Sequence, residues 1–189
     1  MDSRDIVEGI NQTRIGKLIT MANQYLKISE VIRPQTVSLD MPGINCKEQA
    51  IEYLAELLEK AGLLISRQEY IQSVYEREKL GPTYMGNFIA IPHGKSDAVR
   101  EAGVAFGRSN DGFEYLTDLG GGTAKLVFLL AIPNRMSADA YMAVLARLAR
   151  LLVHEEFREN LIVAHSYQEV IQAILNGEKL LEDLSNSMS

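Results

Sequence analysis

Apolar side chains recur every three or four residues in the first part of the chain, a spacing that is typical of a helix. This pattern runs from Arg14 to Ile32, and Pro34 should end the helix because the residue before a proline favours an extended backbone. The residues that follow Pro34, "QTVSLDM", have the composition of a short strand. We therefore expect one helix and one strand before residue 42.

Two further helices are expected before residue 80. Asn45 and Glu48 have the spacing of a capping box, and the apolar face that follows them ends at Gly62. Residues 67–79, "RQEYIQSVYEREK", again place their apolar side chains on one face. The spacing therefore predicts a pair of amphipathic helices in this part of the chain.

Three strand-like runs follow these helices. The last of them, "AKLVFLLAIP", is apolar throughout, which is typical of a central strand that is buried on both faces. The polar, glycine-rich residues 110–123 precede it and predict a hairpin-like connection. The three runs are "TYMGNFIAI" (83–91), "GVAFGRS" (103–109) and "AKLVFLLAIP" (124–133).

The helical period returns at Ala138 and continues through "EEFRENLIVA". Ser166 and Glu169 then form a second capping box, and Gly177 should close the helix that they begin. Residues 178–189 are expected to fray. This order of elements predicts an α/β fold, a mixed β-sheet flanked by helices on both faces.

Length and composition narrow the classes of protein that remain. A chain of 189 residues fits one domain, or one domain with an appendage, and its net charge of −6 disfavours a nucleic-acid binder. The chain shows neither a signal-peptide pattern nor an apolar run long enough to cross a bilayer, so we expect a cytoplasmic protein without membrane insertion. The single cysteine excludes an internal disulfide, and no two histidines have i,i+4 spacing, so no metal or other cofactor is predicted.

The stretch "FIAIPHGKSDAV" carries the strongest candidate chemistry. Its apolar run stops at Pro92, and His93 follows in front of Gly94, which allows a sharp turn and the close approach of a bulky group. A neutral imidazole is a competent nucleophile. The backbone N–H groups of residues 94–96, with the Lys95 ammonium and the Ser96 hydroxyl, suit a phosphate. The spacing is not that of a P-loop, and a turn histidine without a role remains the alternative from these residues alone.

Residues 28–177 resemble the fructose/mannitol type of enzyme IIA in the bacterial phosphoenolpyruvate-dependent sugar phosphotransferase system. The segments "IAIPHGKSDAV", "GVAFGRS", "KLVFLLAIP", "VLARLARLL" and "EEFRENL" occur in the order of that family, and the first two are more similar to its fructose branch. The resemblance implies a mixed α/β sandwich and a phosphotransferase. His93 would accept a phosphoryl group from phospho-HPr and pass it to a cysteine of an enzyme IIB.

Two further residues acquire roles from the resemblance. Arg77, in "YEREKLGPTYMGN", matches the arginine that neutralises the phosphoryl charge, although by itself it also fits a surface arginine paired with Glu76 or Glu78. The family usually carries a second histidine where this chain has Tyr141. A tyrosine donates a hydrogen bond without carrying the same charge at neutral pH, so Tyr141 either works by hydrogen bonding or weakens phosphoryl transfer. Without the resemblance, Tyr141 is a packing residue of its helix.

The remaining candidates have weaker support. Cys46 lies at the opening of a helix, where a thiol can become reactive, but no phosphate-binding loop follows it. His154 is interpreted as a helix-end or surface histidine and His165 as a loop histidine. No acid–base pair can be assigned among the nearby carboxylates of Asp97, Glu101, Asp111 and Asp118.

Partners must reach His93 for a relay, and such transient contacts are small. Met85, Phe88 and Met136 are candidates for the apolar rim around it. Residues 1–27 lie outside the resemblance and are expected to be a helical extension that packs on the domain, ends an upstream module or forms a homodimer. Three functions stay open: a sugar phosphocarrier, a regulatory protein whose His93 phosphorylation is read by a partner, and a non-catalytic interaction module.

Overall fold

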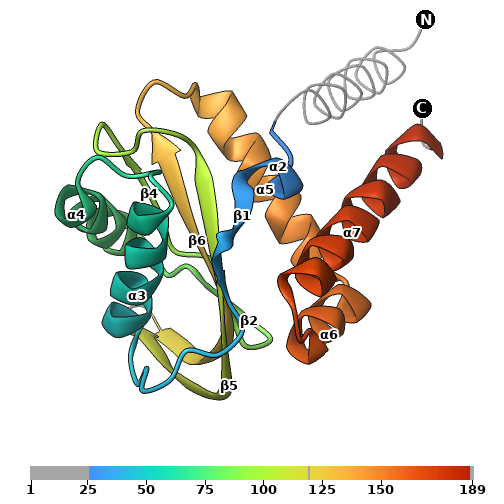
Figure 1. Ribbon diagram of the computed structural model, residues 1–189, viewed down its shortest axis with the longest axis horizontal. Helices are drawn as coiled ribbons and strands as arrows, with labels where there is room; N and C mark the ends of the chain where they lie inside the picture. The colour runs from blue at the N-terminus through green and yellow to red at the C-terminus, as the bar shows by residue number, and fades with distance from the viewer. Residues whose placement is uncertain (1–25, 119, 188–189) are drawn as a thin grey trace, which may run out of the picture.

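The computed structural model describes residues 26–118 and 120–187, and the predicted helical extension of residues 1–27 lies almost entirely outside this part of the chain. Figure 1 shows a sheet with helices on both of its faces, which confirms the predicted α/β fold class. In chain order, the described elements are α2 (Ile28–Val31), β1 (Ile32–Ser38), α3 (Lys47–Lys60), α4 (Arg67–Glu78), β2 (Tyr84–Gly86), β3 (Ile89–Ala90), β4 (His93–Ser96), β5 (Gly103–Thr117), β6 (Gly120–Pro133), α5 (Ala138–Val153), α6 (Glu155–Val163) and α7 (Tyr167–Ser187).

The sheet is mixed, and β6 is its central strand. The described strands follow the order β1-β5-β6-β3-β2, and β4 pairs with β6 beyond β3. Strand β6 is antiparallel to β5 and parallel to both β3 and β4. The prediction that residues 124–133 form a central, buried strand is therefore confirmed.

Two apolar cores cover the two faces of the sheet. Because side chains alternate along a strand, β6 supplies Phe128 and Leu130 to one core and Val127 and Leu129 to the other. Helices α2, α5, α6 and α7 contribute to the first core, and α3 and α4 contribute to the second. Figure 1 shows these two groups of helices on opposite sides of the sheet.

Several predicted boundaries are corrected by the structure. Strand β1 begins at Ile32, inside the predicted first helix, and Cys46 rather than Asn45 is the N-cap of α3. The predicted strand over residues 83–91 is divided into β2 and β3 by a turn in which Asn87 and Phe88 have positive φ angles of 49° and 64°. Residues 110–117 and 120–123 belong to the far half of the β5–β6 hairpin, in agreement with the predicted hairpin-like connection.

The C-terminal residues are helical, so the expectation that they fray is wrong for residues 178–187. Helix α7 begins at the predicted Ser166 cap, whose hydroxyl accepts a hydrogen bond from the Glu169 N–H at 3.2 Å. It then continues through Gly177, where a Cβ atom would lie 2.7 Å from Leu151 Cδ2. Gly177 is therefore a point of close helix packing and not the end of the helix.

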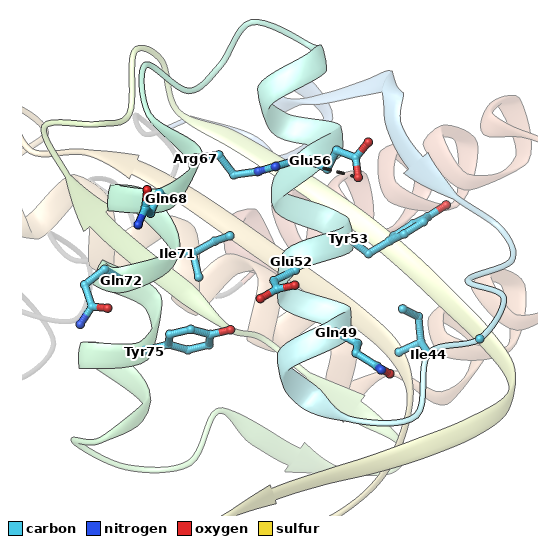
Figure 2. Close-up of a pocket in the computed structure, with 11 residues that line it drawn as sticks. Ile44, Gln49, Glu52, Tyr53, Glu56, Arg67, Gln68, Ile71, Gln72 and Tyr75 are labelled. Carbon is cyan, nitrogen blue, oxygen red and sulfur yellow. Dashed lines mark ion pairs between the residues drawn. The ribbon is translucent and has the colours of Figure 1, made fainter.

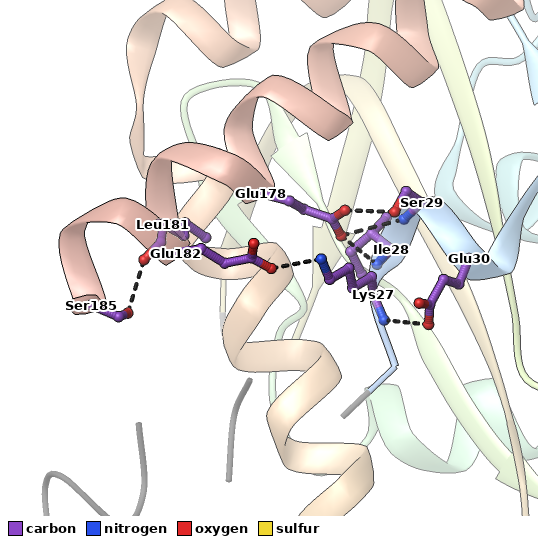
Figure 3. A network of polar contacts seen from close by, with 8 residues as sticks. All are labelled: Lys27, Ile28, Ser29, Glu30, Glu178, Leu181, Glu182 and Ser185. Carbon is purple, nitrogen blue, oxygen red and sulfur yellow. Dashed lines mark hydrogen bonds and ion pairs between the residues drawn. The ribbon is translucent and has the colours of Figure 1, made fainter. Parts of the chain in front are cut away.

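The end of α7 is tied to the beginning of the described chain (Figure 3). The Glu178 carboxylate, which is 3% exposed, accepts hydrogen bonds from the Ile28 N–H at 2.7 Å and from the Ser29 hydroxyl at 2.6 Å. It also accepts the Ser29 N–H at 3.3 Å. Lys27 and Glu182 form an ion pair of 2.7 Å beside this contact. The carboxylate thereby satisfies amide groups at the N-terminal end of α2 that have no partner within the helix.

No helix within the described residues is long and apolar enough to span a bilayer.

Candidate functional site

His93 is the first residue of β4 and pairs with Leu130 of β6. The expected sharp turn after His93 is wrong, because residues 93–96 form a strand. The requirement for glycine at residue 94 comes from packing: a Cβ atom there would lie 2.9 Å from Val74 Cγ2 and would also meet the Ser73 hydroxyl. Gly94 therefore allows α4 to lie directly against β4.

This close approach places Arg77, near the end of α4, beside His93. The Arg77 Nε–H donates a hydrogen bond of 2.9 Å to His93 Nε2. The other ring nitrogen, Nδ1, lies 2.8 Å from the Ile91 carbonyl oxygen. Since a carbonyl only accepts, Nδ1 carries the proton and the Nε2 lone pair faces the guanidinium.

The alternative of Arg77 as a surface arginine paired with a neighbouring glutamate is not what the structure shows. Its Nη1 group donates to the Gly81 carbonyl at 3.1 Å. The Glu76 carboxylate is hydrogen-bonded to Lys79 instead, and Glu78 accepts a hydrogen bond from Thr83. The guanidinium is therefore held between His93 and the turn that follows α4.

Tyr141 approaches the same histidine from α5. The two ring centroids are 5.8 Å apart with an interplanar angle of 51°. Helices α4 and α5 pack on opposite faces of the sheet, so His93 lies at a seam between them. Tyr141 also packs against the core beneath α5, and the packing role and the place beside His93 therefore coexist.

Burial determines the charge state of the site. His93 is 3% exposed, and this burial lowers its pKa; the Arg77 charge acts in the same direction, while the Ile91 carbonyl opposes it. Burial raises the pKa of Tyr141, and the Arg77 charge counteracts part of that effect. At neutral pH the site therefore combines a neutral imidazole, a neutral phenol and one guanidinium charge.

Comparison with known proteins identifies the family. Residues 30–177 match the family described as "Phosphoenolpyruvate-dependent sugar phosphotransferase system, EIIA 2". The chain belongs to this EIIA 2 family. The resemblance found in the sequence is thereby confirmed.

Named relatives of this EIIA 2 chain include two fructose-specific proteins. The fructose-specific EIIA component of Haloferax volcanii is 37% identical over 143 residues, which are 76% of this chain and 91% of the relative. The fructose-specific EIIABC component of Bacillus subtilis is 36% identical over 154 residues, which are 82% of this chain. The match spans only 24% of the length of that Bacillus protein.

Solved structures show the same fold. Nitrogen regulatory protein IIA-Ntr from Neisseria meningitidis superposes with a TM-score of 0.70 at 29% identity, covering 78% of this chain and 98% of that one. The Escherichia coli complex of enzyme IIAMTL with phosphorylated enzyme IIBMTL matches with a TM-score of 0.63 at 29% identity, covering 77% of this chain and 99% of that one. One neighbour in this fold is thus bound to a IIB protein.

The three residues after His93 extend away from it along β4. Lys95 is exposed, and the alternation of a strand places it on the same side of β4 as His93. The Ser96 hydroxyl accepts a hydrogen bond from the Ala98 N–H at 3.0 Å, which fixes the end of the strand. Of the three, Lys95 is therefore the residue whose functional group remains directed toward solvent.

The structure does not bring the other sequence candidates to His93. No hydrogen bond or ring contact of the described residues joins Cys46, His154 or His165 to it. His154 separates α5 from α6, and Glu101 pairs with Arg33 at 2.8 Å. Within the described part of the chain, no group of three or more His, Cys, Asp or Glu residues could hold a metal ion.

Phe88, one of the three residues expected at an apolar rim, lies away from His93: its carbonyl accepts the Lys125 N–H of β6 at 2.7 Å, whereas His93 pairs with Leu130, five positions further along that strand. Met85 is 41% exposed and Phe88 is 49% exposed, whereas Met136 packs partly against the core. Lys125 lies over the Phe88 ring, 5.6 Å from its centroid.

A pocket of about 750 Å³ lies elsewhere, between α3 and α4 (Figure 2). Neither His93, Arg77 nor Tyr141 lines it. The Nε2 atom of His93 is therefore outside this pocket. The residues around the pocket include Ile44, Glu52, Tyr53, Arg67, Ile71 and Tyr75.

Sequence reasoning missed one group of polar residues behind the site. Glu78, Thr83 and Tyr115 are buried and hydrogen-bonded to one another. A signal for Glu78 was present, since it follows Tyr70 and Val74 at i,i+4 spacing and so lies on the inward face of α4.

Proposed function

We propose that this protein is a phosphocarrier of the sugar phosphotransferase system, which accepts a phosphoryl group on His93 Nε2. The observation that carries the proposal is the pair of contacts on the imidazole: the Ile91 carbonyl holds the Nδ1 proton, and the Nε2 lone pair faces Arg77. This arrangement supplies a neutral nucleophile of defined tautomer with a cation beside its reactive atom.

The proposed reaction has two steps: the first exchanges one phosphorus–nitrogen bond for another, and the second exchanges a phosphorus–nitrogen bond for a phosphorus–sulfur bond. The Nε2 lone pair attacks the phosphorus atom of phospho-HPr, a phosphorus–nitrogen bond forms, and the donor's bond breaks with its electron pair returning to the donor. In the second step a IIB thiolate attacks phosphorus, and the pair returns to Nε2. Throughout both steps, Nδ1 keeps its proton and its bond to Ile91.

Arg77 has to move for this chemistry. In the structure its Nε–H occupies the Nε2 lone pair, so the guanidinium must turn from the ring nitrogen to the arriving phosphoryl oxygens. A planar guanidinium can bind two of these oxygens at once. The exposed ammonium of Lys95 adds positive charge along β4, and contacts of Gly94, Lys95 and Ser96 with the phosphoryl group remain part of the proposal.

Tyr141 takes the place of the family's second histidine in this scheme. Its hydroxyl donates a neutral hydrogen bond to the phosphoryl group, and its ring limits the access of water to His93. We expect a weaker stabilisation of the phosphoryl group than an imidazolium would give, and therefore a phosphorylated state that is easily discharged.

The partners and the location are part of the same proposal. An HPr-like donor and a IIB acceptor are expected to dock in turn over His93. The two fructose-specific relatives favour fructose or a related sugar, and we expect such a relay to operate in the cytoplasm. A homodimer through residues 1–27 stays a prediction.

A regulatory function is the second candidate. It is favoured by the similarity to IIA-Ntr of Neisseria meningitidis, a protein described as a nitrogen regulatory protein. The two functions differ in the second step, because only a sugar carrier must discharge its phosphoryl group to a IIB cysteine. Transfer from the phosphorylated protein to purified fructose-type IIB supports the sugar carrier, and a stable phosphoprotein that no IIB discharges supports regulation.

The first experiment follows label from phosphoenolpyruvate through enzyme I and HPr to the protein. We expect acid-labile label on the wild type and on His154→Ala, and none on His93→Gln, whose fold is checked by circular dichroism. Absence of label on the wild type with a range of HPr proteins refutes the proposal, as does label that persists in His93→Gln.

A further inference from the structure

A buried polar cluster of Glu78, Thr83 and Tyr115 begins at the residue that follows Arg77 in α4. The Thr83 hydroxyl donates to the Glu78 carboxylate and lies 3.0 Å from the Tyr115 hydroxyl. Lys47 approaches the same carboxylate, with its Nζ atom 3.9 Å from Glu78 Oε2. The exposed fractions are 8% for Glu78, 3% for Thr83 and 0% for Tyr115, so solvent cannot replace these contacts.

Both site residues are held by the turn that this cluster closes. Arg77 Nη1 donates to the Gly81 carbonyl at 3.1 Å, within the turn. At its end, the Thr83 carbonyl accepts the Ile91 N–H at 2.9 Å. The Ile91 carbonyl in turn binds Nδ1 of His93. One short segment therefore sets the position of the guanidinium and the tautomer of the imidazole.

The first part of the turn is held by backbone hydrogen bonds, from the Leu80 N–H to the Arg77 carbonyl at 3.1 Å and from the Gly81 N–H to the Glu78 carbonyl at 3.3 Å, and these do not reach Thr83. Leu80, in its middle, is 81% exposed, and Gly81 has a φ of +151°. Its two ends are joined across five positions by the hydrogen bond between Glu78 and Thr83. An exposed turn of this kind keeps its geometry only as well as its ends are fixed.

We propose that the Glu78–Thr83–Tyr115 cluster positions the phosphoryl-transfer site, by holding the 79–83 turn so that Arg77 and the Nδ1–H tautomer of His93 are both in place. The inference rests on the proposed function. Glu78 and Thr83 are positioning residues, since neither touches a reacting atom. The carboxylate acts through the turn, and its effect reaches His93 through two backbone carbonyls.

The perturbation that isolates this role is Thr83→Val, which removes the hydroxyl and keeps the shape of the side chain. Thr83→Ser restores the hydroxyl and serves as the conservative variant. Thr36→Val is the matched control. Thr36 is also a buried threonine, and its hydroxyl donates a hydrogen bond of 2.7 Å to the Val104 carbonyl. It lies on β1, at the far edge of the sheet from the site.

The first readout is the ¹⁵N NMR spectrum of the imidazole, which distinguishes a protonated from an unprotonated ring nitrogen. The chain has only three histidines, so the His93 signals can be assigned by substitution of the others. We expect the Nδ1–H tautomer in the wild type, Thr83→Ser and Thr36→Val, and a mixture of both tautomers in Thr83→Val. This measurement needs no phosphoryl donor.

The second readout is the rate of phosphorylation by phospho-HPr. We expect a loss of about 10- to 100-fold in Thr83→Val, the size expected when reacting groups are misplaced by about 1 Å, with recovery in Thr83→Ser. Thr83→Ala, measured beside it, provides the same loss of hydroxyl if the valine variant does not fold.

Either of two kinds of outcome overturns the inference, and the second can be seen in two ways. One is a folded Thr83→Val or Thr83→Ala that keeps a single Nδ1–H tautomer and the wild-type rate. The other is a loss of rate with an unchanged tautomer, or an equal loss in Thr36→Val, because the hydroxyl is then a general structural contact. A wild type that accepts no phosphoryl group refutes the proposed function instead, and the NMR result still decides whether the cluster sets the tautomer.

Discussion

Replacement of Arg77 by methionine tests the central electrostatic argument. Methionine keeps much of the aliphatic bulk and removes the charge and every N–H donor. The unphosphorylated protein loses one charge-assisted hydrogen bond, the 2.9 Å contact with His93 Nε2. The phosphoprotein is proposed to lose two, because the guanidinium binds a pair of phosphoryl oxygens.

The net effect is the difference between these two losses, about one charge-assisted bond. Such a bond contributes roughly 1.5–3 kcal/mol, which corresponds to a factor of about 10–150 in the equilibrium constant for phosphorylation. Solvent screening should reduce this value little, because His93 is 3% exposed. The same substitution should raise the pKa of His93, since the Arg77 charge now lowers it.

The assay measures the phosphorylated fraction by intact mass at a fixed ratio of phospho-HPr to HPr, and the His93 pKa by NMR titration. Arg67→Met is the matched control, since Arg67 begins the same helix and pairs with Glu59 on the surface. The reasoning is refuted if Arg77→Met reaches the same phosphorylated fraction as Arg67→Met, or if the His93 pKa falls.

Four further predictions concern the surrounding structure. Gly94→Ala should destabilise the protein by about 1–3 kcal/mol, because the new Cβ overlaps α4, and denaturant unfolding measures this loss. The same substitution should slow the labelling of His93 in the phosphoenolpyruvate assay. Tyr141→Phe should reduce the equilibrium constant for phosphorylation by about 2- to 12-fold, the effect of one neutral hydrogen bond of about 0.5–1.5 kcal/mol. An unchanged phosphorylated fraction in the mass assay leaves Tyr141 with packing alone. Glu178→Ala should lower the unfolding free energy by roughly 1–3 kcal/mol in urea, because buried amide groups lose their acceptor. Glu182 is only half-buried and pairs with Lys27, so Glu182→Ala should cost less than about 1 kcal/mol; equal effects of the two substitutions contradict this prediction. Burial raises the pKa of Glu78, so the folded state binds the proton of this carboxyl more tightly than the unfolded state does. Stability should therefore fall as the pH rises from about 4.5 through the higher pKa of the folded state. Unfolding curves measured from pH 4 to 8 should lack this decline for Glu78→Gln, and parallel curves for the two proteins contradict the prediction.

The local sequence was enough to predict those helices and strands whose apolar pattern is visible within a single segment. The apolar period identified α3, α4 and α5, and the continuous apolar run at residues 124–133 identified the central strand. His93 could be identified for the same reason, because the change from an apolar strand to Pro92–His93–Gly94 is visible without any distant residue. The family motifs added Arg77 and Tyr141, which the structure places beside His93.

Errors arose where a distant contact outweighed a local preference. Gly177 normally predicts a helix end, but α7 continues because that glycine packs against Leu151 and because Glu178 binds the amide groups of residues 28–29. Gly94 likewise predicts a turn from the local sequence, but the residue has to be glycine because α4 lies directly against it. No local pattern reports either contact.

The sequence by itself thus determined the class of fold, the family and the candidate histidine. The tertiary structure alone decided which imidazole nitrogen faces the guanidinium, since that depends on where the Ile91 carbonyl and Arg77 lie around the ring. It also brought Glu78, Thr83 and Tyr115 together in one buried cluster from positions up to 37 residues apart. The physical reason is that periodicity records which side of an element faces the core, whereas hydrogen bonds between elements depend on how those elements pack.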